Sequence, residues 1–233
     1  MPTSELHDTT AVILAGGLGT RLKSVVPDRQ KVVAPVAGRP FIFQLLTQLD
    51  DAGVRKVVLC TGYQADQVAI TLGKAYRDIR LEYSAEPSPL GTAGALRNAL
   101  PLLDSDPVLV LNGDSYCEVD LPDLFKIHQG PATLVVREVE DTTQSGRVDF
   151  DESGKIISFI EKGAISGPGW INAGIYLLGR DLLKSIPAGG AVSLERDIFP
   201  TRIGYGLRAF RTRGRFLDIG TPDSYSRAQK VFI

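Results

Sequence analysis

The sequence has few of the residues that carry covalent or metal chemistry. Its 233 residues include two cysteines, two histidines, one tryptophan and one methionine. We expect Cys60 and Cys117 to be reduced, partly buried thiols, because a chain of this size needs no disulfide to stabilise its core. His7 and His128 have no partners at the spacing of metal ligands, so we expect both on the surface. The sequence therefore gives no support to covalent catalysis.

An excess of charge and long hydrophobic runs are also absent. There are 26 basic and 27 acidic residues, so the chain lacks the positive charge that drives most nucleic-acid binding. No apolar run approaches the roughly 20 residues that span a bilayer, and the N-terminal segment lacks the basic flank of a signal peptide. We expect a cytoplasmic protein with no nucleic-acid or membrane partner. One phosphorylated small molecule remains compatible with the charge balance.

Short apolar, β-branched runs bounded by turn residues are frequent, and they predict strands. The runs are 11–15, 57–61, 79–83, 108–112, 133–136, 171–178 and 207–212. Segments with helical periodicity are 40–51, 65–72, 92–100, 121–129 and, at the end of the chain, 222–231. In the first half, strands and helices alternate, which predicts a parallel sheet covered on both faces.

The alternation breaks near Gly130. Beyond that point, 147–150 and 156–161 resemble an antiparallel hairpin with a polar turn. We expect an α/β fold, a three-layer α/β/α Rossmann-like domain over 1–233 with a mixed, mainly parallel central sheet. Its first half, 1–130, would be parallel, and its second half, 131–233, more antiparallel.

A glycine-rich loop, 16–22, follows the first strand. Its glycines allow the backbone N–H groups to approach an anion, and Thr20 and Arg21 add a hydroxyl and a guanidinium. A plain glycine turn between a strand and a helix would look similar. Leu22 stands where the dinucleotide fingerprint has its third glycine, and the sequence contains no Gly-Lys-Ser/Thr. The loop therefore binds phosphate in some other way, or not at all.

Two aspartates and two lysines complete the candidate chemistry. Asp114 ends the strand 108–112, and Asp218 precedes the last helix, so the pair can hold Mg²⁺ together with phosphate oxygens and water. Each alone could equally be a helix cap or turn former. Lys31 and Lys162 would neutralise phosphate charge, although most lysines are solvated surface residues.

The run 11–22 resembles the signature of the sugar-1-phosphate nucleotidyltransferases. Further blocks that resemble the family follow in the same order at 89–96, 111–114, 161–162, 170–176 and 216–222, and together they span nearly the whole chain. The resemblance implies the nucleotidyltransferase fold. It also implies that 1–130 is the nucleotide-binding half and 131–233 the sugar-phosphate-binding half.

The resemblance also implies roles for individual residues. The nucleotide-binding set is Leu14, Ala15, Gly16, Gly17, Gly19, Thr20, Arg21, Glu86, Gly91, Thr92 and Asn112. The sugar-phosphate set is Gly146, Glu161, Lys162, Asn172 and Glu195. The catalytic residues would be Arg21, Lys31, Asp114 and Lys162, with Asp114 and Asp218 as ligands of a Mg²⁺ cofactor. One position departs from the family pattern, because Gln30 stands where a proline usually precedes the lysine.

The implied reaction needs no general base. The anionic oxygen of a sugar 1-phosphate attacks the α-phosphorus of a nucleoside triphosphate in line, and pyrophosphate leaves. Catalysis would consist of aligning two polyanions and distributing transition-state charge over Mg²⁺, Arg21, Lys31 and Lys162. A homo-oligomer is left open, because no motif encodes a subunit interface.

Substrate identity depends on fewer residues. Glu86 lies where relatives contact the base, and its carboxylate could accept from guanine N1–H and N2–H together or from the single N3–H of uracil; GTP is favoured. The chain length and the blocks 111–115, 145–148 and 193–200 look most like bacterial D-glycero-α-D-manno-heptose 1-phosphate guanylyltransferases. That group makes GDP-heptose, a nucleotide sugar used in polysaccharide biosynthesis. Glu195 would contact a sugar hydroxyl, or else cap a short helix.

Three alternatives remain. A mannose-1-phosphate guanylyltransferase, or a muramate- or glucose-type uridylyltransferase, would keep the same catalytic residues. A glycosyltransferase of related fold needs Asp-x-Asp after a central strand, whereas Asp104-Ser105-Asp106 precedes its strand. A non-catalytic nucleotide-sugar sensor would be free to lose Arg21, Lys31, Asp114 or Asp218, and all four are present.

Overall fold

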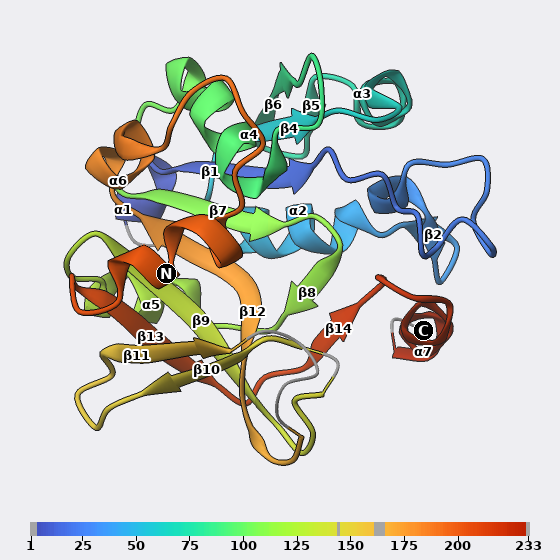
Figure 1. The fold of residues 1–233 in the computed structure, drawn as a ribbon. Helices are drawn as coiled ribbons and strands as arrows, with labels where there is room; N and C mark the ends of the chain where they lie inside the picture. Colours follow the sequence, from blue (N-terminus) through green and yellow to red (C-terminus); the bar gives the residue numbers. More distant parts are fainter. Residues whose placement is uncertain (1–3, 144, 161–165, 232–233) are drawn as a thin grey trace.

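A large mixed β-sheet forms the centre of the molecule. The computed structural model describes residues 4–143, 145–160 and 166–231. Within them, the sheet order is β11-β10-β12-β7-β1-β4-β6-β5, and β9 joins β12 to β13 (Figure 1). The strands are β1 (Thr10–Ala15), β4 (Lys56–Thr61), β5 (Ala75–Tyr76), β6 (Ile79–Ala85), β7 (Val108–Asn112), β9 (Ala132–Val139), β10 (Arg147–Phe150), β11 (Ile156–Ile160), β12 (Gly169–Leu178) and β13 (Leu207–Thr212).

Strand direction changes between the two halves of the chain, as the sequence predicts. β7, β1, β4 and β6 are parallel neighbours. β12 is antiparallel to β7 on one side and to β9 on the other, and β10 and β11 form the predicted hairpin. The mixed α/β fold is confirmed.

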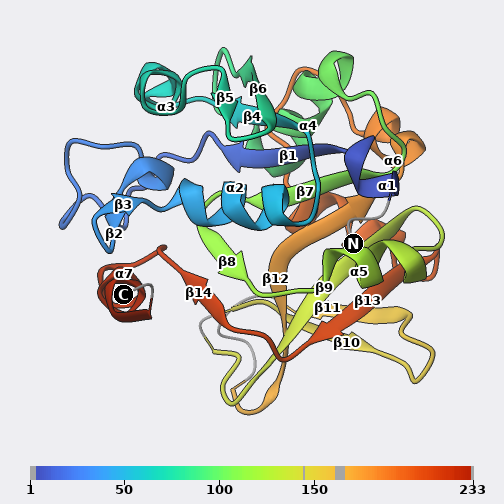
Figure 2. The same ribbon diagram turned by 180° about the vertical axis from the view of Figure 1, so that it is seen from behind.

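Helices cover both faces of the sheet, because side chains alternate along each central strand. In β1, Ala11, Ile13 and Ala15 belong to one core cluster, while Val12 belongs to the other. The first cluster includes residues of α2 (Ile42–Asp51), α3 (Ala65–Leu72) and α5 (Leu121–Ile127), and the second includes residues of α4 (Gly91–Ala99) and α6 (Arg180–Ser185). α4 and α6 are nearer the viewer in Figure 1, and α2 and α5 in Figure 2.

Several short elements were not predicted. They are α1 (Ser4–His7), the two-residue pair β2 (Pro35–Val36) and β3 (Arg39–Pro40), β5, α6, and the pair β8 (Ser115–Cys117) and β14 (Phe216–Asp218). The antiparallel β8–β14 pair has the largest consequence, because Asp114 and Asp218 lie at one of its ends. The last helix, α7 (Pro222–Val231), lies apart from the others and packs beside the β2–β3 segment (Figures 1 and 2).

Both cysteines are free and buried, more completely than the sequence suggests. Burial raises the pKa of Cys117 to about 12 and also raises that of Cys60. Both therefore remain protonated thiols near neutral pH. Among the described residues, no helix is long and apolar enough to span a membrane.

Candidate active site

Two adjoining cavities lie at the carboxyl ends of β1 and β7, where open α/β sheets bind ligands. The smaller, of about 290 Å³, lies against the glycine loop and the start of α4. The larger, of about 830 Å³, is lined by residues of β12, β14, α7 and the helical turn η3 (Leu194–Ile198). Asn112 and Asp114 line both cavities. The arrangement suits two ligands that must meet near Asp114.

The glycine loop lies against Glu86 in the smaller cavity. A Cβ on Gly16 would lie 2.4 Å from Glu86 Oε1, so only glycine lets the backbone approach this carboxylate so closely. Glu86 Oε2 accepts a hydrogen bond from Leu90 N at 2.9 Å, which fixes the carboxylate beside the start of α4. Burial raises the pKa of Glu86 above its ordinary value. A partly buried carboxylate in this position can accept hydrogen bonds from a ligand's N–H groups.

The two aspartates are brought together by the β8–β14 pair. Asp218 lies opposite Ser115 in this pair, and Ile219 N donates to the backbone oxygen of Asp114 at 2.9 Å. Both side chains line the larger cavity. No local sequence pattern shows how these residues meet, because they are more than a hundred positions apart.

Cations converge on the same place. Lys31 Nζ lies 2.6 Å from Asp114 Oδ2, and the lysine side chain is only 10% exposed. A Cβ on Gly220 would lie 3.1 Å from Asp218 Oδ1, 3.6 Å from Lys31 Nζ and 4.0 Å from Arg21 Nη2. Gly220 therefore leaves room for two cations and a carboxylate around one point. Such an alternation of charge suits a phosphate together with a metal ion.

The donor set of this pair fits Mg²⁺. Asp218 Oδ1 accepts from Ser224 Oγ at 2.7 Å and from Gly220 N at 2.8 Å, which fixes the carboxylate. Through its hydrogen bond with Gly220 N, Asp218 also forms a turn. Its side chain nevertheless lines the larger cavity. Among the residues described, no group of three or more His, Cys, Asp or Glu side chains is arranged so that it could hold a metal ion. The pair therefore suits a hard cation that takes its remaining ligands from phosphate and water.

A buried hydrogen-bond network connects the two cavities on the side of η3. The hydroxyl of Tyr176, which is fully buried, accepts from Asn172 Nδ2 at 2.8 Å and donates to Glu195 Oε1 at 3.2 Å. Glu195 Oε2 accepts from Thr92 Oγ1 and from Ser193 Oγ, each at 2.9 Å. Burial and the charge of Glu195 raise the pKa of Tyr176, so it remains a neutral donor. Ser193, rather than Glu195, caps η3.

Among the residues that line the two cavities, one buried acceptor has no partner within the described part of the chain. Asn112 Oδ1 is inaccessible to solvent and accepts no hydrogen bond in the described part of the chain. Leaving such a group unpaired costs about 1–3 kcal/mol.

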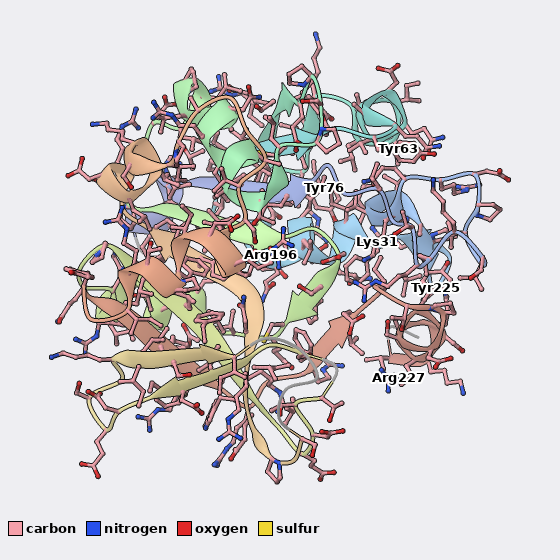
Figure 3. The ribbon with its side chains drawn as sticks, viewed as in Figure 1. Lys31, Tyr63, Tyr76, Arg196, Tyr225 and Arg227 are labelled. Atoms are coloured by element: carbon pink, nitrogen blue, oxygen red, sulfur yellow. The ribbon has the colours of Figure 1, made fainter. Side chains whose placement is uncertain are left out.

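The larger cavity contains two arginines that sequence reasoning missed. Arg196 comes from η3 and Arg227 from α7, and Figure 3 shows both together with Lys31 on three separate segments. Neither guanidinium has an ion-pair or hydrogen-bond partner within 4–143, 145–160 and 166–231. Unpaired guanidinium groups in a cavity suit an anionic ligand. Only their placement in space distinguishes them from ordinary surface arginines.

The predicted residues are distributed between the cavities. The smaller cavity is lined by Leu14, Ala15, Gly16, Gly17, Lys31, Glu86, Gly91, Thr92, Asn112 and Asp114. The larger is lined by Arg21, Asn112, Asp114, Gly146, Asn172, Glu195 and Asp218. Gly19 and Thr20 line neither cavity. Glu161 and Lys162 lie outside the described residues, and Gln30 and Ala95 line the smaller cavity without having been predicted.

Known proteins resemble this chain over nearly its whole length. D-glycero-alpha-D-manno-heptose 1-phosphate guanylyltransferase of Aneurinibacillus thermoaerophilus is 35% identical over 227 residues, which cover 94% of this chain and 96% of that protein. Mannose-1-phosphate guanylyltransferase of Mycobacterium tuberculosis is 33% identical, over 95% of this chain and 64% of that protein.

A solved structure and a family model agree with these relatives. The structure of HddC from Yersinia pseudotuberculosis complexed with GMP-PN superposes with a TM-score of 0.86 at 34% identity, over 97% of this chain and 100% of that one. The family model described as nucleotidyl transferase matches residues 10–232. The resemblance seen in the sequence motifs is confirmed, and the chain belongs to the nucleotidyl transferase family.

Proposed function

We propose that this chain transfers GMP from GTP to D-glycero-α-D-manno-heptose 1-phosphate, giving GDP-heptose and pyrophosphate. The observation that carries the proposal is the pair of adjoining cavities with Asp114 at their junction. A relative with this activity in its name is 35% identical along nearly its full length. GDP-heptose would supply polysaccharide biosynthesis. The buried thiols agree with a reducing cytoplasmic location.

The nucleotide would occupy the smaller cavity and the sugar phosphate the larger. Every residue that lines the smaller cavity comes from the first half, 1–130, whereas the larger also takes residues from 145–146, 159–160 and 172–227. This division supports a nucleotide-binding half and a sugar-phosphate-binding half, 131–233, within one domain.

The chemistry is alignment and charge stabilisation. An oxygen of the sugar phosphate forms a bond to the α-phosphorus, and the bond from that phosphorus to pyrophosphate breaks. Because the attacking oxygen is already anionic, no general base is needed. Arg21 and Lys31 would hold phosphate oxygens, Asn172 and Glu195 would contact the sugar, and Glu161 and Lys162 remain predictions for the sugar phosphate. A Mg²⁺ held by Asp114 and Asp218 would neutralise phosphate charge.

Pyrophosphate release tests the proposal directly. GTP, UTP, ATP, CTP and dTTP would each be combined with heptose, mannose and glucose 1-phosphates. We expect release to be fastest with GTP and the heptose phosphate. Preference for mannose 1-phosphate would replace the sugar assignment, and activity confined to UTP would overturn the assignment of guanine. No release with any pair would favour a non-catalytic sensor.

Glu86→Gln should weaken the use of GTP. Guanine presents two N–H donors on one edge, and a carboxylate accepts from both, whereas an amide offers one acceptor and one donor. Losing a hydrogen bond to a charged group costs about 1.5–3 kcal/mol, so kcat/KM for GTP should fall about 10–100-fold. The UTP rate relative to GTP should rise.

The raised pKa of Glu86 adds a pH signature. The base-binding form is the carboxylate, which is present above the raised pKa and lost as pH falls through it. The KM for GTP should therefore rise on acidification at a higher pH than an ordinary glutamate would give. Glu86→Gln should abolish this dependence, and Glu140→Gln, at an exposed position, should keep it. An identical pH profile in the native chain and Glu86→Gln would contradict the role of Glu86.

A further inference from the structure

The side chain of Gln30 is buried beneath the glycine loop and uses both ends of its amide. It is 1% exposed. Its Nε2 donates to the carbonyl oxygens of Ala15 at 2.6 Å and Gly17 at 3.3 Å, and its Oε1 accepts from Val32 N at 2.6 Å. One amide therefore connects the end of β1 and the glycine loop to η1 (Lys31–Val33), the turn that carries Lys31.

These contacts set the direction of the loop's peptide groups. In a planar trans peptide, the N–H of the next residue points opposite to the carbonyl. With the carbonyls of Ala15 and Gly17 turned toward Gln30, the N–H groups of Gly16 and Leu18 point away from it. Backbone N–H groups of this kind bind anions in glycine-rich loops.

A second glutamine holds the same segment from outside. Gln67, on α3, accepts from Gln30 N at 2.9 Å through Oε1 and donates from Nε2 to Asp28 O at 3.0 Å. The segment leading to Lys31 is thus fixed on one side by α3 and on the other by the glycine loop. Lys31 then reaches Asp114 Oδ2 at 2.6 Å.

We propose that Gln30 is a positioning residue for nucleotidyl transfer, which orients the glycine loop and Lys31 together toward the nucleotide. The inference rests on the proposed function. The backbone φ of Gln30 is −62°, the value that a proline ring imposes, so proline could preserve the backbone path to Lys31. Proline could supply neither the amide that binds the loop nor the N–H that binds Gln67.

The test compares Gln30→Met, Gln30→Pro and Gln67→Met with Gln129→Met, an exposed control. In Gln30→Met, misplacement of the loop and Lys31 should lower kcat/KM for GTP about 10²-fold, while the KM for the sugar phosphate stays within about twofold. Both Gln30 variants should have a raised KM for GTP. The kcat of Gln30→Pro should be higher than that of Gln30→Met, because proline preserves the backbone path to Lys31. Gln67→Met, which alters a partly exposed side chain, should change the KM for GTP and kcat in the same direction as Gln30→Met but to a smaller extent. In the double variant, the effects of Gln67→Met and Gln30→Met should not add.

Nucleotide affinity, measured by calorimetry with a non-hydrolysable GTP analogue, separates this inference from the proposed function. If the native chain releases no pyrophosphate, the proposed function fails, and weaker analogue binding by the Gln30 variants still supports the positioning role. Native KM and analogue affinity in folded Gln30→Met or Gln30→Pro would overturn it. An equal rise in the KM values of both substrates would also overturn it, because general disruption of the fold would explain that result. If Gln30→Met does not fold, the kinetics of Gln67→Met provide the test. A native KM for GTP and a native kcat in Gln67→Met would then overturn the inference.

Discussion

Asp114→Asn is expected to reduce Mg²⁺-dependent pyrophosphate release about 10²–10³-fold or more. Asp114 lines both cavities, and its carboxylate is 45% exposed while accepting from Lys31. Asparagine keeps the volume and one acceptor oxygen for Lys31 but removes the negative charge that a divalent cation requires. The fold should therefore survive while the metal-dependent reaction does not.

Binding of Mn²⁺ in the presence of a non-hydrolysable nucleotide, followed by electron paramagnetic resonance, gives a readout independent of turnover. Asp114→Asn should weaken this binding, and so should Asp218→Asn. Asp181→Asn, on the exposed surface of α6, is the matched control and should behave as the native chain does. Near-normal turnover with native Mn²⁺ affinity in Asp114→Asn would remove this residue from the metal site.

The parts of the fold that could be predicted are those with a local signal. The central strands are buried on both faces, so they read as continuous apolar runs, and α2 has apolar residues at helical spacing. β8 and β14 have three residues each and contain Ser115, Tyr116 and Asp218, so neither has a recognisable period. Their pairing joins segments a hundred residues apart, which no local pattern records. The pairing of the two aspartates was expected from their positions near strand ends and from the resemblance, and the β8–β14 pair explains how they meet.

The candidate site shows the same limit. The sequence reveals that Gln30 takes the place of a proline, but its contacts with Ala15 and Gly17 depend on how the loop folds back. Arg196 and Arg227 look like surface arginines until η3 and α7 are placed around the larger cavity. Motifs therefore identified most of the residues that line the two cavities, whereas Arg196, Arg227 and the contacts of Gln30 became evident only from the packing.

Lys31→Met should lower kcat/KM for GTP about 10²–10³-fold. Lys31 is nearly buried, and its ammonium lies between Asp114, 2.6 Å away, and the space around Gly220 that Arg21 also approaches. Methionine has similar length and apolar character, so the packing of the side-chain stem is kept while the charge is lost. Lys126→Met, at an exposed position on α5, is the control and should retain native activity.

A double-mutant cycle shows whether Lys31 acts through Asp114 or through the nucleotide. If the lysine serves only to hold Asp114, the double variant Lys31→Met/Asp114→Asn should be no slower than Asp114→Asn alone, because residues in contact are not additive. If it also holds phosphate oxygens, the double variant should be slower still, and the affinity for a GTP analogue should fall in Lys31→Met but not in Asp114→Asn measured without metal. We expect the second pattern, since Lys31 lines the smaller cavity as well as touching Asp114. Native analogue affinity in Lys31→Met would restrict the lysine to the carboxylate, and other cations of the site, such as Arg21, would then hold the phosphates.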